Sequence, residues 1–236
     1  MTNKEKRSKV FSMLLGDGCI GVYKTDGYKT GRLVIDHGLS QSDLQKWKAQ
    51  QLSEIFNQPV KTGYGHKGKS MQLCVRNKKF KAWRKFTYPN GRKSLPLVLK
   101  YITDPIFAMA VWLMDDGYCE PSFSKLADGS KKNYGARFRI FTATQTDEEM
   151  LQIKEWIDRE FNVNCSIKKH YDSRQKKYYP LIKLGAPDTL KVWKLIRDLV
   201  LQFESMKYKF RYVEQIYQFK ITQPTPSDKL DDIVDN

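Results

Sequence analysis

The chain has 236 residues, of which 40% are hydrophobic and 13% aromatic, so it can form one large folded domain or two small ones. Its net charge of +16 favours a polyanionic partner such as a nucleic acid. No stretch has the length and apolarity of a membrane-spanning helix, and the first residues lack the apolar run of a secretory signal. The four cysteines are far apart without a CxxC pair, which disfavours a zinc ribbon or a redox pair. We therefore expect an intracellular protein, in bacterial or phage-infected cytoplasm or in an organelle.

In chain order, the first predicted helix carries VFSMLLGDG at 10–18 and ends at its Asp-Gly pair. Segments rich in Val, Ile, Tyr and Phe predict strands after it, and an amphipathic pattern then predicts a second helix. A glycine-rich hairpin and a further helix close this part of the chain. These predicted elements are the strands 20–23 and 31–36, the helix 43–56, the hairpin 60–75 and the helix 79–86.

The same order of elements begins again at Asp104-Pro105, a capping residue followed by proline at the first helical position. The helix that starts there carries MAVWLMDDG at 109–117, which also ends in Asp-Gly. Further on, Thr146 and Glu149 have the spacing of a capping box. The other predicted elements are the strand 136–142, the helix 147–161, the hairpin 163–184 and the helix 189–203.

Shorter matches between the two parts occur in the same order along the chain. LSQSD at 39–43 matches ATQTD at 143–147, and IFN with EFN and FKAW with LKVW follow, with offsets that rise only from 99 to 110. The sequence therefore predicts an α+β fold of two pseudo-symmetric αββαββα halves with antiparallel sheets, residues 1–100 and 101–222. Residues 223–236, with four aspartates and two prolines, are predicted to form a flexible acidic tail.

Basic residues follow the predicted strands. RFRIF at 137–141 alternates arginine with apolar residues, so one face of its sheet would pack and the other would be basic. The hairpin at 168–183 has six basic residues and three tyrosines around its turn. Such ribbons can enter the major groove of DNA, although charged strands also serve as solubilising surfaces. Because basic ribbons occur in both halves, we predict DNA-binding roles for Lys24, Lys29, Arg32, Lys67, Lys69, Arg76, Arg137, Arg139, Lys168, Lys169, Arg174, Lys176 and Lys177.

The two Asp-Gly pairs end apolar helices at equivalent places. If the helices pack around a pseudo-two-fold axis, Asp17 and Asp116 meet at one point. Two carboxylates at helix C-termini form a strongly negative spot, which in a basic protein predicts a divalent metal site suited to phosphodiester hydrolysis. Asp-Gly is also an ordinary turn or helix-end pair. The repetition at the equivalent place favours the metal site.

These motifs and their spacing resemble the two motifs of a LAGLIDADG homing endonuclease, and most closely the single-chain, intron-encoded type. The resemblance covers about 220 of the 236 residues. It implies that the motif helices form the interface between the halves and that two saddle-shaped antiparallel sheets lie along the major groove. It also implies a monomer whose catalytic aspartates bind Mg²⁺, with Mn²⁺ as a substitute, and which cuts both strands of double-stranded DNA to leave short 3′ overhangs.

The resemblance also assigns site residues. Asp17 and Asp116 stand at the eighth motif position, and Gly16 and Asp115 at the position before complete the implied metal set; the alternative role of Asp115 is helix-end solvation. The lysine near the end of each half corresponds to Lys93 and to Lys209, with Lys207 as the alternative. Gln41 and Gln145 match a glutamine at the entry to the middle helix, where helix capping is the alternative. Ser12 and Val111 replace motif glycines, so the helix interface must pack differently from the consensus.

Three functions remain in competition. The favoured one is a Mg²⁺-dependent endonuclease, because both Asp17 and Asp116 are present. The alternative is a LAGLIDADG protein that does not cleave, either a maturase that binds its host intron RNA or a nucleic-acid-binding regulator. A ribosomal or RNA-coating basic protein would leave the repeated Asp-Gly helix ends unexplained. The target sequence, the type of mobile element and the role of the tail stay open.

Overall fold

The computed structural model of the protein describes residues 1–23, 30–65, 68–125, 129, 131–142 and 144–222. The predicted acidic tail and the candidate DNA-binding residues Lys24, Lys29 and Lys67 lie outside the described residues. Within the described ranges, none of the helices combines the length and apolarity needed to cross a membrane.

Helices and strands alternate in the same order twice. The first series is α1 (Asn3–Leu15), β1 (Cys19–Gly21), β2 (Gly31–Gly38), α2 (Ser42–Phe56), β3 (Thr62–Gly65), β4 (Ser70–Asn77), α3 (Lys78–Thr87) and the short α4 (Leu95–Leu99). The second series is α5 (Pro105–Asp116), β5 (Gly117–Lys125), β6 (Lys131–Phe141), α6 (Asp147–Phe161), β7 (Ser166–Asp172), β8 (Lys177–Lys183), α7 (Ala186–Val200) and α8 (Lys207–Thr222).

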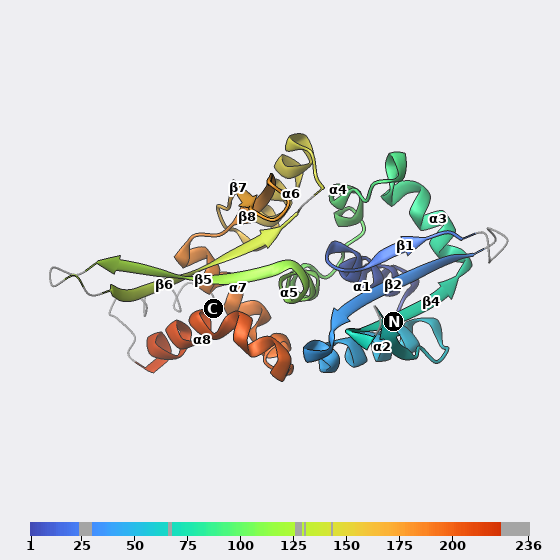
Figure 1. Ribbon diagram of the computed structural model, residues 1–236, viewed down its shortest axis with the longest axis horizontal. Coiled ribbons are helices and arrows are strands. Elements are labelled where there is room, and N and C mark those ends of the chain that lie inside the picture. The colour runs from blue at the N-terminus through green and yellow to red at the C-terminus, as the bar shows by residue number, and fades with distance from the viewer. Residues whose placement is uncertain (24–29, 66–67, 126–128, 130, 143, 223–236) are drawn as a thin grey trace.

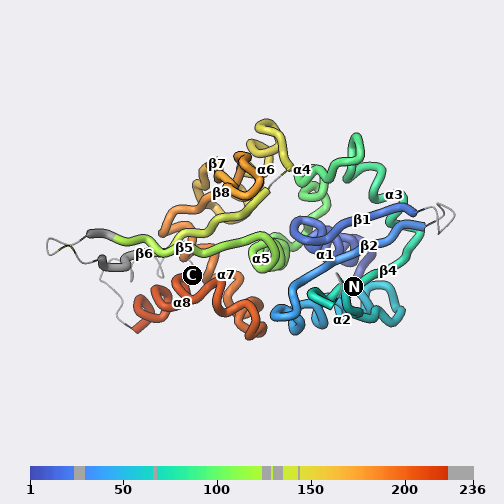
Figure 2. The backbone as a smooth tube through the Cα atoms, viewed as in Figure 1, coloured from blue at the N-terminus to red at the C-terminus, as the bar shows by residue number. Residues whose placement is uncertain are grey.

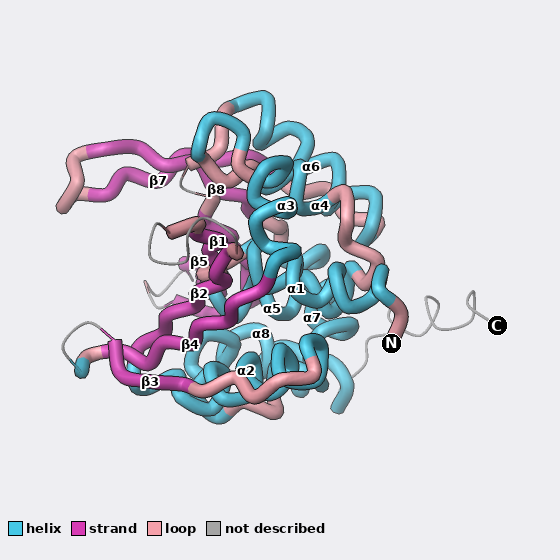
Figure 3. Tube along the Cα trace, turned by 90° about the vertical axis from the view of Figure 1, so that its right-hand side faces the viewer, coloured by secondary structure: helices cyan, strands magenta, loops and turns pink. Residues whose placement is uncertain are grey.

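Each series builds a four-stranded antiparallel sheet, with strand orders β1-β2-β4-β3 and β5-β6-β8-β7. The predicted α+β fold with repeated αββαββα halves is confirmed. The sheets gather on one side of the molecule and the helices on the other (Figure 3). Because side chains alternate between the faces of a strand, each sheet buries one face under helices and presents the other.

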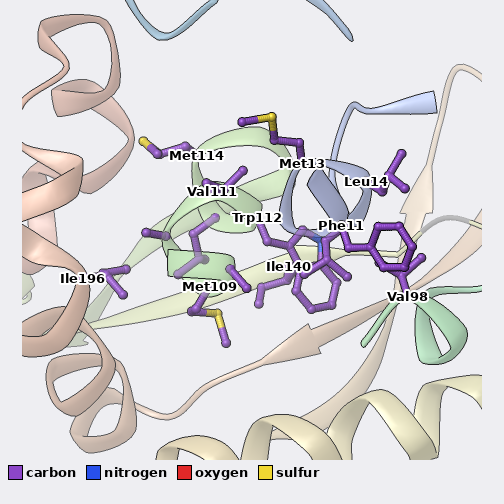
Figure 4. Close-up of a cluster of buried hydrophobic side chains, with 14 of the residues drawn as sticks. Phe11, Met13, Leu14, Val98, Met109, Val111, Trp112, Met114, Ile140 and Ile196 are labelled. Atoms are coloured by element: carbon purple, nitrogen blue, oxygen red, sulfur yellow. The ribbon is translucent and has the colours of Figure 1, made fainter. Parts of the chain in front are cut away.

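Helices α1 and α5 lie next to each other at the centre of the molecule, between the two sheets (Figures 1 and 2). Asp104 caps α5 by accepting a hydrogen bond from the Phe107 N–H at 2.9 Å, as its sequence predicts. The side chains of Phe11, Met13 and Trp112 are fully buried there (Figure 4). A helix that is apolar on all sides needs partners on all sides, which α5 finds in α1, α7 and the second sheet.

The interface tolerates the two departures from the motif. Ser12 is fully buried, and its hydroxyl donates to the Ser8 carbonyl oxygen of the preceding turn at 3.0 Å. Its polar group is therefore satisfied within α1. Val111 is buried on α5 without a polar group to satisfy.

The sequence did not predict the short helix α4, the strand β5 or the helix α8. Strand β5 contains Pro121, which lacks an N–H and weakens the strand pattern, but β5 is an edge strand, where a proline is tolerated. Helix α8 is rich in Tyr, Phe and Ile, residue types that favour strands. It is a helix because Phe210 and Val213, three residues apart, are buried beneath β5 and β6.

The segment that ends each half docks on the other half. Gln145 accepts a hydrogen bond from the Leu95 N–H at 2.9 Å, and Arg92 lies 2.7 Å from the Glu149 carboxylate. In the reverse direction, Asp43 on α2 accepts from the Ser205 N–H at 3.1 Å. These exchanges place the segments around 93 and 209 at the centre of the molecule, beside the ends of α1 and α5.

Candidate active site

The two Asp-Gly pairs end α1 and α5 in closely similar ways. Gly16 caps α1, so Asp17 directly follows the helix, and Asp116 is the last residue of α5. A Cβ atom on Gly18 would overlap with the Met13 carbonyl oxygen, and one on Gly117 with the Leu113 carbonyl oxygen. The glycine that ends each motif is therefore required by close backbone approach, in both halves for the same reason.

The carboxyl groups of Asp17 and Asp116 share one electrostatic environment. Burial, and then the negative charges of Asp17 and Asp115, raise the pKa of Asp116 to about 7. Burial, and then the charge of Asp115, raise the pKa of Asp17 to about 6. Binding of a cation stabilises neighbouring carboxylates, because its positive charge offsets the repulsion between them.

Lys93 and Lys209 approach the two helix ends from opposite halves. Lys93 Nζ donates to the carbonyl oxygens of Gly16 and Gly18 at 2.7 and 3.0 Å. Lys209 Nζ donates to those of Met114 and Asp115 at 2.6 and 2.8 Å. Burial lowers the pKa of both lysines, while the neighbouring aspartates oppose that change. The positive charges therefore lie at the negative C-terminal ends of α1 and α5.

The geometry favours Lys209 over its alternative. Lys207 forms an ion pair with Glu204 at 2.5 Å, and both of these side chains are exposed. It is the first residue of α8, and its ion-pair partner Glu204 lies outside the motif helices.

The two candidate glutamines hold different neighbours. Gln145 is buried and bridges the Leu95 N–H and the Lys93 carbonyl oxygen, which lie on either side of Ser94. Gln145 thereby holds the main chain that carries Lys93. Gln41 Oε1 lies 3.1 Å from His37 Nδ1. Gln145 therefore acts through Lys93, which binds the carbonyl oxygens on either side of Asp17, and Gln41 acts through His37, which contacts Asp17 itself.

A buried polar cluster lies behind Asp17. Asp115 Oδ1 is 2.5 Å from Lys48 Nζ, and Lys48 Nζ is 3.0 Å from His37 Nε2. The side chains of Lys48 and Asp115 are fully buried. His37 Nδ1 lies 3.2 Å from Asp17 Oδ2. Burial, and then the charge of Lys48, lower the pKa of His37 to about 4, so its imidazole is neutral at neutral pH.

His37 and Lys48 were not predicted as site residues, although each stands in an apolar pattern that indicates burial. Lys48 stands between Leu44 and Leu52 on the apolar stripe of α2, where a lysine must find a buried partner. His37 continues the buried alternation of Leu33 and Ile35 in β2. Their partner Asp115 comes from the other half, so the pairing itself follows only from the fold.

Gly16 and Asp115, the equivalent residues before the motif aspartates, compete for the same space. A Cβ atom on Gly16 would overlap with the Cβ and Oδ2 atoms of Asp115. Only one of the two positions can therefore carry a side chain, and Asp115 directs its carboxylate from α5 into the first half.

The donor set fits a hard divalent cation such as Mg²⁺. The carboxylates of Asp17 and Asp116 and the main-chain carbonyl groups of Gly16 and Asp115 are oxygen ligands of the type that Mg²⁺ prefers. Ligand atoms of Asp17, His37 and Asp115 also lie within 4.8 Å of one another. In that second group the Lys48 ammonium already neutralises Asp115, which leaves the Asp17 and Asp116 pair as the stronger cation site.

The described DNA-binding candidates lie on the outer faces of the two sheets and around their hairpin turns. Arg32 and Arg76 are paired in register opposite the face that buries Leu33 and Val75. In the second sheet, Arg137 and Arg139 alternate with the buried Phe138 and Ile140. The remaining described candidates lie at or near the hairpin turns: Lys69, Lys168, Lys169, Arg174, Lys176 and Lys177.

Strand alternation divides these hairpin residues between the two faces. Ser166 and Lys183 are in register with each other, and Lys183 is in register with Arg139, so Lys168 shares the face of Arg139. Lys169 lies on the opposite face with Ile167. Glu120 forms ion pairs with Arg139 and, at 2.9 Å, with Lys183. Lys183 was not among the predicted DNA-binding residues, and only the register of β6 and β8 places it beside Arg139.

Comparison with known proteins gives a family and a set of similar folds. The family model described as "LAGLIDADG DNA endonuclease family" matches residues 7–187, a range that contains both Asp-Gly motifs. The structure is similar to that of the homing endonuclease I-WcaI bound to its DNA recognition sequence, with 20% sequence identity, a TM-score of 0.60, and 88% of this chain and 86% of that chain covered.

Two further solved structures share the fold. The LAGLIDADG homing endonuclease I-GzeII in complex with its DNA target is 12% identical, with a TM-score of 0.52 and coverage of 98% of this chain and 96% of that chain. The meganuclease I-SmaMI bound to uncleaveable DNA with a TTCT central four is 13% identical, with a TM-score of 0.51 and coverage of 98% and 97%. A search of the curated proteins gave no match.

Proposed function

The chain belongs to the LAGLIDADG DNA endonuclease family, and from this premise we propose that it is a site-specific homing endonuclease. It binds a long double-stranded DNA target as a monomer and hydrolyses both strands, leaving short 3′ overhangs. The observation that carries the proposal is that the two motif ends, one from each half, bring Asp17 and Asp116 to one acidic point, where burial and then neighbouring aspartates raise the pKa of both carboxyl groups.

Asp17 and Asp116 would hold the divalent ion, Mg²⁺ or Mn²⁺, with the carbonyl groups of Gly16 and Asp115 beside them. When bound, such an ion lowers the pKa of an attacking water and neutralises charge on the scissile phosphate. With a pKa of about 7, the Asp116 carboxyl group is partly protonated at neutral pH, so binding of the ion would release protons from it.

Lys93 and Lys209 bring positive charge next to the same point. Their ammonium groups are fixed on main-chain carbonyl oxygens of the two motif ends, so they are preorganised and need no rearrangement when negative charge develops on a phosphate. Gln145 fixes the main chain of Lys93, and Gln41 fixes His37 beside Asp17. These four residues therefore act on the reacting groups or on the residues that carry them.

DNA would lie along the exposed faces of the two sheets. Arg32, Arg76, Arg137 and Lys168 provide charge for phosphates and donors for base edges. The three solved structures with similar folds each contain bound DNA, which supports this placement by analogy. Binding through several lysines and arginines should weaken steeply as the salt concentration rises.

Cleavage of a randomised double-stranded DNA library tests this function. Incubation with Mg²⁺ should recover one long motif cut on both strands with 3′ overhangs, whereas incubation with Ca²⁺ should leave it intact. Tight binding of DNA or of intron RNA without any cut product would contradict the endonuclease and support the non-cleaving maturase or regulator instead.

A further inference from the structure

Four polar side chains from both halves form a closed ring of contacts around Asp17. The Asp17 N–H donates to Asp115 Oδ2 at 3.2 Å, and Asp115 Oδ1 accepts from Lys48 Nζ at 2.5 Å. Lys48 Nζ also donates to His37 Nε2 at 3.0 Å, and His37 Nδ1 lies 3.2 Å from Asp17 Oδ2. The ring therefore holds Asp17 at two points, its main-chain N–H and its carboxylate.

The ring is buried except at Asp17. The side chains of Lys48 and Asp115 are fully buried and that of His37 is 1% exposed, whereas the side chain of Asp17 is 37% exposed. Asp17 is thus the one member that faces outward, toward the side where a substrate could approach. The other three lie behind it.

Stability alone does not account for this arrangement. A buried ion pair often contributes no more than a well-packed apolar pair of similar volume, because both charges lose their hydration. The second half has an apolar residue, Ile153, at the position equivalent to Lys48. Ile153 stands nine residues before Asn162, which caps α6, and Lys48 stands nine residues before Asn57, which caps α2. Both side chains are fully buried. The polar version occurs only where Asp115 reaches across from α5.

We propose that Asp115, Lys48 and His37 are positioning residues that fix the orientation of Asp17. This inference rests on the proposed function. Asp115 belongs to α5 whereas Lys48 and His37 belong to the first half, so Asp17 is oriented only when the two halves are docked. The second motif aspartate, Asp116, has no counterpart of Lys48 behind it, because Ile153 fills that position. The two strand cuts should therefore respond differently to loss of the ring.

The ring can be opened without leaving a buried charge unpaired. Lys48→Ile alone leaves the buried Asp115 carboxylate without its counter-charge, and Asp115→Ala alone leaves the buried Lys48 ammonium without its counter-charge. The double variant removes both charges and places in the first half the residue that the second half already uses. Leu52→Ala, a buried residue on the same helix outside the ring, is the control for loss of stability.

Thermal unfolding of these variants without metal is the first measurement. Each single variant should have a lower Tm than the wild type, and the double variant should recover most of that loss, because neighbouring charges are coupled. If the loss of Tm in the double variant equals the sum of the losses in the single variants, Lys48 and Asp115 are not coupled and the proposed ring of contacts is wrong.

Cleavage of each strand of a labelled target, recovered from the library experiment, is the second measurement. In the double variant one strand cut should slow by about 10- to 100-fold while the other stays within about threefold, so that nicked DNA accumulates. Leu52→Ala should leave the ratio of the two strand rates unchanged. A stable double variant that cuts both strands at the wild-type ratio would refute the positioning role.

The two proposals fail in different ways. If the wild type cuts no DNA, the endonuclease function is wrong and the positioning role falls with it. If the wild type cuts and the ratio of strand rates is insensitive to the ring, only the positioning role is wrong. If Mn²⁺ raises the Tm of the wild type and Lys48→Ile strengthens that effect, then Asp17, His37 and Asp115 form an ion site, and the positioning role is again wrong.

Discussion

The two halves build the same fold but fill the space behind their motif aspartates differently. In the first half the buried residues are Lys48, Gln45 and His37; at the corresponding places the second half has Ile153, Met150 and Thr142. The alignment is fixed by Asn57 and Asn162, which end α2 and α6 in the same left-handed conformation with φ of 49°.

One residue explains this difference. Asp115 takes the space at the interface that Gly16 leaves open and sends its carboxylate into the first half. A buried carboxylate needs a counter-charge and further donors, which Lys48 and the Asp17 N–H supply. At the equivalent place the second half buries the apolar side chains of Ile153 and Met150 instead. A duplicated scaffold can therefore become asymmetric through a single side chain that crosses its axis.

Substitution of either motif aspartate should have the largest effect on DNA cleavage, and the effect should be similar for both in spite of this asymmetry. Asp17→Asn and Asp116→Asn should each lower the rate of double-strand cleavage by at least about a hundredfold, because each removes charge from the shared ion site. Affinity for the target should stay within about threefold. Gel-based cleavage and binding assays measure both quantities. Asp198→Asn, at a side chain that is 95% exposed, is the matched control; cleavage at the wild-type rate by either motif variant would contradict the assigned site.

The lysines provide a second test of likeness between the halves. Lys93→Met and Lys209→Met should each slow cleavage by about 10- to 100-fold, since each removes one preorganised ammonium group beside a motif end. Single-turnover rates at saturating Mg²⁺ measure the effect. Lys207→Met is the control, because this lysine is exposed and pairs with Glu204. A loss confined to the Lys207 variant would exchange the two assignments.

The carboxyl pKa values predict a pH dependence of stability in the metal-free protein. Asp116 and Asp17 have pKa values of about 7 and about 6 in the folded state, against a usual value of 3.8. Their contribution to the free energy of unfolding is therefore complete below about pH 4 and is lost as the pH rises through 6 to 7. Thermal unfolding in a chelator should show this decline, and Asp116→Asn should make it shallower. Parallel curves for the wild type and the variant would contradict the pKa shift of Asp116.

The sheets should show the smallest difference between the halves. Glu120 neutralises part of the charge of Arg139 and Lys183 on the second sheet. Glu120→Gln should raise the affinity for nonspecific DNA by a few-fold and steepen the dependence of binding on salt, because two cations are released for phosphates. Fluorescence anisotropy across a salt series measures both effects. Unchanged affinity and slope would mean that this face does not contact DNA.

Much of this architecture could be predicted from the repeat. The predicted helix 147–161 coincides with α6, and the capping box of Thr146 and Glu149 is present there. The repeated motif also led to Asp17 and Asp116, which stay predictions as catalytic residues. Such features are local or periodic, so the sequence displays them directly.

What could not be predicted depends on contacts between the halves. The positions of Lys48 and His37 in apolar patterns indicate burial, but their partner Asp115 reaches them from α5 and is identified only by the fold. Strand β5 was not predicted because Pro121 interrupts the strand pattern. Proline is tolerated in an edge strand, but that β5 lies at the edge follows only from the assembled sheet. In each case the meaning of a residue depends on a neighbour that is distant in sequence.

The central claim is that Asp17 and Asp116 hold divalent metal jointly, one from each half. Calorimetric titration of Ca²⁺ into the complex of the protein with its target DNA tests this claim most directly. Because we expect no cleavage with Ca²⁺, the heat measured reports binding of the ion alone. We expect saturable binding by the wild type, a marked loss of affinity in Asp17→Asn and in Asp116→Asn, and no binding at this site in the double variant. Equal Ca²⁺ binding by the wild type and the double variant would contradict it.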